Sequence, residues 1–74
     1  MNKVELPKRV MVAAAIPEGS VVRIPEDVYP ELGVQKIVEV LFSTPAPGSI
    51  TWILEDGFDV MVGGAKKIEV VSLP

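Results

Sequence analysis

The sequence predicts an all-β fold: a small barrel of five to six short antiparallel strands with at most one helical turn. Val, Ile and Thr are frequent, and these residues favour strands. Pro and Gly recur every few residues, so no window keeps an apolar stripe at helical spacing for three turns. The chain has 74 residues, 49% of them hydrophobic and 23% charged, which indicates one compact domain. Within it we expect 1–19 to form an amino-terminal strand and turn, and 20–74 to form the barrel.

The first two strands are predicted at 9–16 and 21–24, with "PEGS" at 17–20 turning the chain between them. In the second strand, Val22 and Ile24 share one face. Alternation in the first strand predicts two faces: Val10, Val12, Ala14 and Ile16 on one, and Ala13 and Ala15 on the other.

The segment "PEDVYPELG", 25–33, is predicted to be a structured loop closed by Gly33, because Pro30 removes an amide and excludes a long helix. The longest strand follows at 34–43. The prolines of "TPAPGS", 44–49, cannot donate to a ladder, so this segment is predicted to be a loop. Alternation places apolar residues on both sides of the long strand: Val34, Val38, Val40 and Phe42 on one side, with Gln35, Ile37, Glu39 and Leu41 on the other.

The stretch "ITWILEDGFDVMV", 50–62, is predicted to be a tight β-hairpin. A two-residue loop of Asp56 and Gly57 would mix polar and apolar side chains on both faces. A three-residue loop that also includes Glu55, with Gly57 left-handed in a bulge, gives one wholly apolar face. That face pairs Leu54 with Phe58, Trp52 with Val60 and Ile50 with Val62. We therefore expect the three-residue loop, with the indole and phenyl rings buried on the same side.

The last strand is predicted at 67–73, after a "GGAK" turn at 63–66. The order of strand "VVRI", loop "PEDVYPELG", strand "VQKIVEVLFS", hairpin "WILEDGFDVMV" and strand "KIEVV" resembles the small SH3-like barrels over about residues 20–72. The resemblance implies strands bent around one core, a long strand shared between two sheets, and binding more often than catalysis. Ribosomal and transcription-factor relatives bind RNA through a basic loop, whereas this loop is acidic.

A second resemblance leads to a different function. "VVRIPEDVYPELGVQKIVEV" is similar to the swapped-hairpin family of antitoxins and transition-state regulators, whose pattern is a strand, Ile-Pro, a short helix, Leu-Gly and a Val-rich strand. The residues that match are Ile24, Pro25, Leu32, Gly33, Val38 and Val40. This family implies a DNA-binding transcriptional regulator or antitoxin, in which Lys8, Arg9 and Arg23 would contact phosphate.

The composition excludes several kinds of chemistry. The chain has no Cys and no His, so it lacks thiolate ligands, the commonest transition-metal ligand and the usual general base. No nucleophile–base pair, phosphate-binding glycine loop or paired buried carboxylates can be recognised. We expect a non-enzymatic protein with no cofactor and no metal, and the absence of Cys favours the cytoplasm. The net charge of −3 and the scattered basic residues argue against nucleic acid, and the apolar run at 10–16 is too short to span a membrane.

The remaining candidate for a site is apolar surface. Five residues are candidates for binding a partner. Alternation places Ile53 and Met61 on the outside of the hairpin and Ile37 and Leu41 on the second face of the long strand, and the acidic loop contributes Tyr29. We expect these residues to bind another protein or a second copy of the chain, most simply as a homodimer. Such a protein suits an accessory role, for example in a mobile element. The alternative is that residues 10–16 cover this surface.

Overall fold

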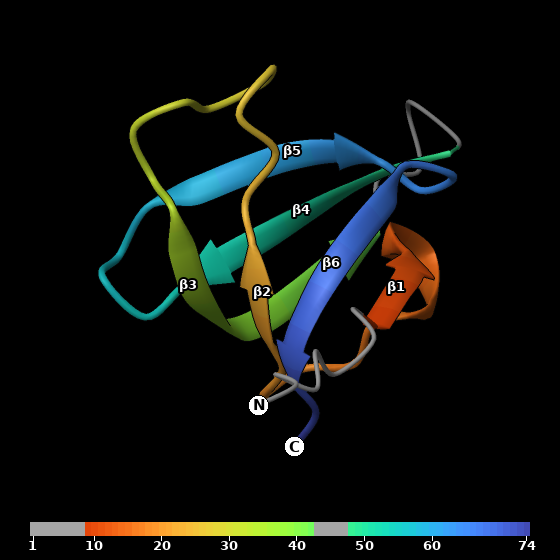
Figure 1. The fold of residues 1–74 in the computed structure, drawn as a ribbon, viewed down its shortest axis with the longest axis horizontal. Coiled ribbons are helices and arrows are strands. Elements are labelled where there is room, and N and C mark those ends of the chain that lie inside the picture. The colour runs from red at the N-terminus through yellow and green to blue at the C-terminus, as the bar shows by residue number, and fades with distance from the viewer. Residues whose placement is uncertain (1–8, 43–47) are drawn as a thin grey trace, which may run out of the picture.

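The computed structural model describes residues 9–42 and 48–74, and the predicted all-β class is confirmed there (Figure 1). Six antiparallel strands and one 3-10 turn form this part of the chain: β1 (Arg9–Val12), η1 (Ala13–Ala15), β2 (Val21–Arg23), β3 (Val34–Phe42), β4 (Ser49–Leu54), β5 (Asp59–Gly63) and β6 (Lys67–Ser72). The predicted loop at 44–49 falls mostly outside the described residues. No helical segment in the described part has the length and apolar character needed to cross a bilayer.

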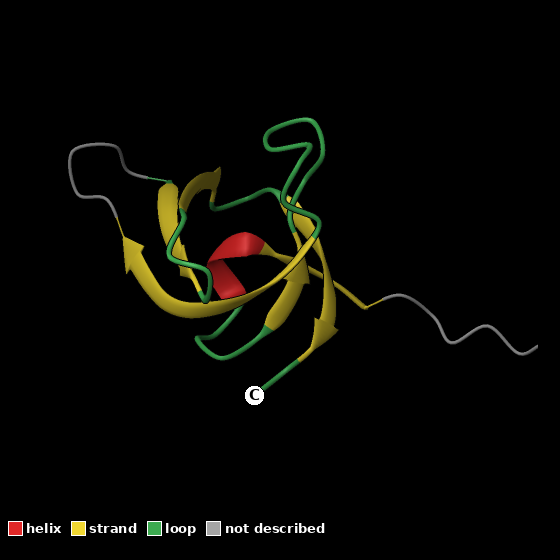
Figure 2. Cartoon of the chain, turned by 90° about the vertical axis from the view of Figure 1, so that its left-hand side faces the viewer, coloured by secondary structure: helices red, strands yellow, loops and turns green. Residues whose placement is uncertain are grey.

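The strands form one antiparallel series in the order β1-β6-β2-β3-β4-β5. Figure 2 shows the strands curving around a single interior, and in this view η1 is seen at the centre of the curved sheet. The long strand β3 pairs with β2 through its first residues and with β4 through the rest, so it is shared between two sheets. The segment 25–33 forms turns rather than the short helix implied by the swapped-hairpin resemblance.

The hairpin has the predicted three-residue loop. Gly57 has φ +94°, and its N–H donates to the carbonyl of Leu54 over 2.9 Å. The N–H of Leu54 donates to the carbonyl of Phe58 over 2.8 Å, which closes the ladder. The register therefore pairs the residues that were expected to pair, Trp52 with Val60 and Ile50 with Val62.

Phe58 is the exception on the predicted apolar face of the hairpin, because the other five residues of that face are buried. The ring was expected in the core, yet the residue is 60% exposed, while Leu54 is buried. Phe58 precedes the first residue of β5, and its N–H donates to the Asp56 carboxylate within the turn. The backbone has the expected pairing, but the side chain of Phe58 is largely exposed to solvent.

The first predicted strand is also shorter than expected. Residues 9–16 were expected to form one strand, but the strand ends at Val12, opposite Lys67, where β6 begins. The next two amides, of Ala13 and Ala14, donate to the carbonyls of Lys66 and Gly64 in the following turn. The chain therefore enters a 3-10 turn against one end of the barrel. The burial differs from the prediction accordingly: Ala13 and Ile16 are buried, while Val10, Val12 and Ala14 are exposed.

A β-bulge in β3 overturns the predicted alternation of the long strand. Ile37 pairs with Leu54 and Glu39 pairs with Ile53, so Val38 is an extra residue between them. Ile37 is fully buried and Val38 is 46% exposed, the reverse of the prediction. One inserted residue exchanges the two faces of a strand, and the pattern of side chains alone does not reveal where the insertion lies.

The interior is a single aliphatic core around the only Trp. Trp52 is fully buried, as expected, and Tyr29, Leu32 and Val40 pack against the core from its margin. The buried hydrophobic residues are Ala13, Ile16, Val22, Ile24, Ile37, Ile50, Trp52, Leu54, Val60, Val62, Ile68 and Val70.

Candidate functional site

Three of the five residues predicted to bind a partner lie together on the outer face of β3, β4 and β5: Leu41, Ile53 and Met61. Cross-strand pairing sets two rows on this outer face: Leu41, Thr51 and Met61 in one, and Glu39, Ile53 and Asp59 in the other. Met61 is 56% exposed, Leu41 is exposed, and Ile53 is half-buried between two acidic residues. Residues 10–16 do not cover this face, because Leu41 and Met61 remain exposed.

Ile37 does not belong to the site. The bulge at Val38 turns its side chain into the core, where it is fully buried. Tyr29, in contrast, lies close to the predicted surface. Its hydroxyl accepts a hydrogen bond from the N–H of Met61 over 3.2 Å, so the loop at 25–33 reaches the edge of β5.

That contact frames a groove between the loop and the hairpin, which we call the loop–hairpin groove. Its volume is about 270 Å³. The loop supplies one wall and the start of β5 supplies the other: Val28, Tyr29, Pro30, Glu31 and Leu32 face Phe58, Asp59 and Val60. Exposed Val28 and Phe58 give it an apolar lining that water reaches.

The loop wall is held at its base by the backbone and along its length by two side chains. The N–H of Ile24 donates to the carbonyl of Gly33 over 2.8 Å, and Gly33 takes the left-handed φ of +62° that closes the loop. The Tyr29 hydroxyl makes the first side-chain contact. The second is an ion pair in which Lys66 Nζ lies 2.6 Å from the Asp27 carboxylate. The hydrogen bond from Lys66 lowers the pKa of Asp27.

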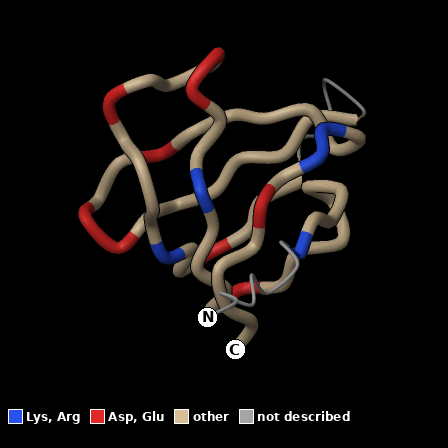
Figure 3. Tube along the Cα trace, viewed as in Figure 1, with Lys and Arg blue, Asp and Glu red and all other residues tan. Residues whose placement is uncertain are grey.

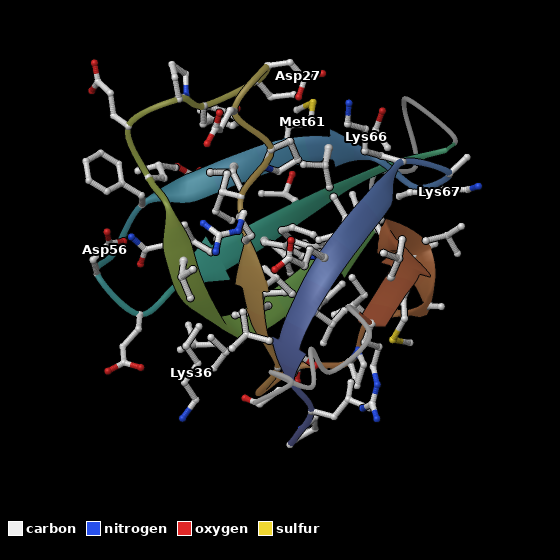
Figure 4. All side chains as sticks on the ribbon, in the orientation of Figure 1. Asp27, Lys36, Asp56, Met61, Lys66 and Lys67 are labelled. Carbon is white, nitrogen blue, oxygen red and sulfur yellow. The ribbon has the colours of Figure 1, made fainter. Side chains whose placement is uncertain are left out.

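Acidic residues surround the loop–hairpin groove. Glu31 and Asp59 line it directly. Figure 3 shows further Asp and Glu positions along the loop between β2 and β3 and in the turn between β4 and β5, while basic positions lie on β2, on β3 and at the start of β6. In Figure 4, Asp56 lies at the hairpin turn, and Asp27, Met61 and Lys66 lie along the upper edge of β5. A cationic ligand would therefore meet a favourable potential here.

The sequence reasoning missed this groove because it placed Phe58 in the core. It found Tyr29 and the acidic loop, but not the ring that faces them across the groove. The available signal is the position of Phe58 directly after the glycine of the bulge, before the first residue of β5.

A second groove lies between η1 and the free edge of β3. It is lined by Ala14, Ala15, Ile16, Pro17, Glu18, Val40 and Phe42. The Glu18 carboxylate accepts a hydrogen bond from the N–H of Val40 over 2.9 Å, which satisfies this edge of the strand. Glu18 is the one charged residue among the described residues that line this second groove. The charge of the lining therefore indicates the chemistry of a ligand less clearly than in the loop–hairpin groove.

The described residues contain no group of three or more acidic side chains placed to hold a metal ion. No protein-family model, curated protein or solved structure matches this chain.

Proposed function

We propose that this is a non-enzymatic binding protein that holds an extended, basic segment of another protein in the loop–hairpin groove. The observation that carries the proposal is the apolar lining formed by Val28, Tyr29 and Phe58 inside an acidic rim. An exposed aromatic beside an aliphatic wall is a common anchor point in protein interfaces. The resemblance to SH3-like barrels supports the same class of function.

The size of the groove favours a peptide side chain over a small molecule. A volume of about 270 Å³ lies just below the range of roughly 300–1,000 Å³ that is typical of small-molecule pockets. One or two side chains of a longer ligand would fill it, and the rest of that ligand would lie on the surface.

The charge of the rim favours a cationic ligand. Glu31 and Asp59 line the groove, so a ligand bearing Lys or Arg gains attraction while an acidic one is repelled. The same carboxylates oppose the phosphates of DNA, which places the regulator alternative second. Because these charges are exposed, we expect binding to weaken as salt rises from low to physiological concentration.

Self-association remains a prediction. A two-fold contact through the outer face would bring Glu39 and Asp59 of both copies into one interface, where like charges are unfavourable. A different, cationic partner avoids this cost. Sedimentation of the protein at micromolar concentration measures self-association separately from groove binding.

The proposal is tested by selecting a random dodecapeptide phage library on the full chain. We expect enrichment of peptides with Lys or Arg beside aliphatic residues. Phe58→Ser should weaken the selected peptides by about 5- to 30-fold, which is the effect of losing an interface anchor. Phe42→Ser is the matched control, because Phe42 is 66% exposed and lines the other groove.

Two outcomes would contradict the proposal. One is a selection that enriches nothing above the uncoated support. The other is a set of peptides that lose equal affinity with Phe42→Ser and Phe58→Ser, since that would mean the loop–hairpin groove has no special part in binding.

A further inference from the structure

We infer that the ligand binds by strand pairing: its backbone adds to the free edge of β5 at Asp59, with a basic side chain there and an apolar side chain on either side of it. This inference rests on the proposed function and specifies its geometry. It follows from the direction of the backbone groups of β5, from what already occupies them, and from the alternation of side chains in a strand.

The backbone of Asp59 points away from the sheet. β5 is the last strand in the order, so only one of its edges is paired. The N–H of Leu54 donates to the carbonyl of Phe58, so Leu54 and Phe58 form a hydrogen-bonded pair, or rung, of the antiparallel ladder. Hydrogen-bonded pairs recur at every second residue, so Trp52 and Val60 form the next one. The direction of the backbone groups alternates along an antiparallel strand, so the N–H and C=O of Asp59, between these rungs, and of Met61, after Val60, face the open edge.

Met61 cannot offer a complete rung at that edge. Its N–H already donates to the Tyr29 hydroxyl over 3.2 Å. The next outward residue, Gly63, has its carbonyl taken by the N–H of Lys66 at 3.0 Å. No other described residue donates to or accepts from the outward backbone groups of Asp59. Asp59 is therefore the rung that still has both a donor and an acceptor.

This rung lies beside the loop–hairpin groove, because Asp59 and its neighbours Phe58 and Val60 form one wall of the groove. A ligand residue paired with Asp59 exchanges two hydrogen bonds with it, as strand-adding peptides do at an exposed sheet edge. Tyr29 stops the pairing from extending to Met61. The added strand is consequently short, and the groove must supply the remaining contacts.

Alternation then fixes the order of side chains in the ligand. The ligand residue opposite Asp59 has its side chain on the same outer face, in line with the row Glu39, Ile53 and Asp59. A Lys or Arg at this position lies directly beside the Asp59 carboxylate, and the Glu39 carboxylate follows farther along the row, beyond Ile53. The residues before and after it point to the other face, toward Leu32 and Phe58 in the groove. The recognised pattern is apolar, basic, apolar in extended conformation.

The test uses blocked heptapeptides with a central Val-Lys-Val or Val-Glu-Val, titrated into the full chain with amide chemical shifts as the readout. We expect the Lys peptide to shift the amide of Asp59 and to bind more tightly than the Glu peptide. Asp59→Asn should reduce this preference by about 2- to 5-fold, as for an exposed charge pair. Glu39→Gln, two strands further from the ligand, is the control and should change it less.

The strand pairing is tested on the peptide, so that protein folding is not affected. Methylating the backbone nitrogen of the central Lys blocks the N–H that would donate to the Asp59 carbonyl. We expect this change to weaken binding by about 5-fold or more, because it removes a hydrogen bond and adds a clash at the edge. Methylating the nitrogen of the following Val, whose N–H points away from β5, is the control and should cost less than about 2-fold.

The outcomes separate the two proposals. If library-selected peptides bind through Phe58 but both methylated forms bind equally well, the groove is used and the strand pairing is wrong. Equal binding of the Lys and Glu peptides would overturn the assigned position of the basic residue. If no selected peptide depends on Phe58, the proposed function itself fails, whatever the heptapeptides do.

Discussion

The bulge in β3 predicts opposite roles for two adjacent aliphatic residues. Ile37 is fully buried opposite Leu54, whereas Val38 is 46% exposed and unpaired. Replacing Ile37 by Ala removes three carbon groups from the core, about 2.4 kcal/mol at roughly 0.8 kcal/mol each. The cavity left behind adds to this, so we expect Ile37→Ala to cost about 2–5 kcal/mol. Val38→Ala removes two half-exposed groups and should cost under about 1 kcal/mol.

Urea unfolding followed by the fluorescence of Trp52, which is fully buried and the only Trp, measures both changes. The free energy of unfolding of a chain of this length is about 4–11 kcal/mol, so Ile37→Ala removes a large part of it. Ile37→Val, expected to cost about 0.5–1.5 kcal/mol, keeps the comparison measurable if the Ala variant unfolds. A larger loss for Val38→Ala than for Ile37→Ala would refute the bulge and restore simple alternation.

Three further predictions concern the hairpin and the loop that frames the groove. Gly57→Ala should lower the free energy of unfolding by about 1–2 kcal/mol in the same assay, because φ is +94° there; an unchanged value would contradict the left-handed turn. Tyr29→Phe removes the acceptor for the N–H of Met61, so hydrogen exchange of that amide should speed up by about 2- to 10-fold, whereas unaltered protection would show that the hydroxyl does not cap the edge. Lys66→Gln should raise the pKa of Asp27, measured by carboxyl ¹³C shifts against pH. The ion pair lowers the pKa of Asp27 in the folded chain, so the pair stabilises the fold at pH values above the ordinary carboxyl pKa. This stabilisation is lost as the pH falls through the lowered pKa of Asp27. An identical titration of Asp27 in both proteins would contradict this prediction.

The candidate site was only partly predictable. Tyr29 was identified from its place in the acidic loop, and Met61 from the parity of the hairpin. Their direct contact, between a hydroxyl and an amide 32 positions apart in sequence, depends on how the loop folds back over β5. The loop–hairpin groove follows from the same tertiary arrangement, so no pattern within either segment indicates it.

The sequence by itself determined the β class, the approximate position of the strands and the register of the central hairpin. These features are local: Pro and Gly limit the backbone where they stand, and Gly57 with a three-residue loop brings apolar residues to one face. Only the tertiary structure decided which way Ile37 faces, where the first strand ends and whether the ring of Phe58 is covered. Each of these depends on a partner strand or turn that is distant in sequence, because pairing sets a bulge and burial requires a neighbour on the other side.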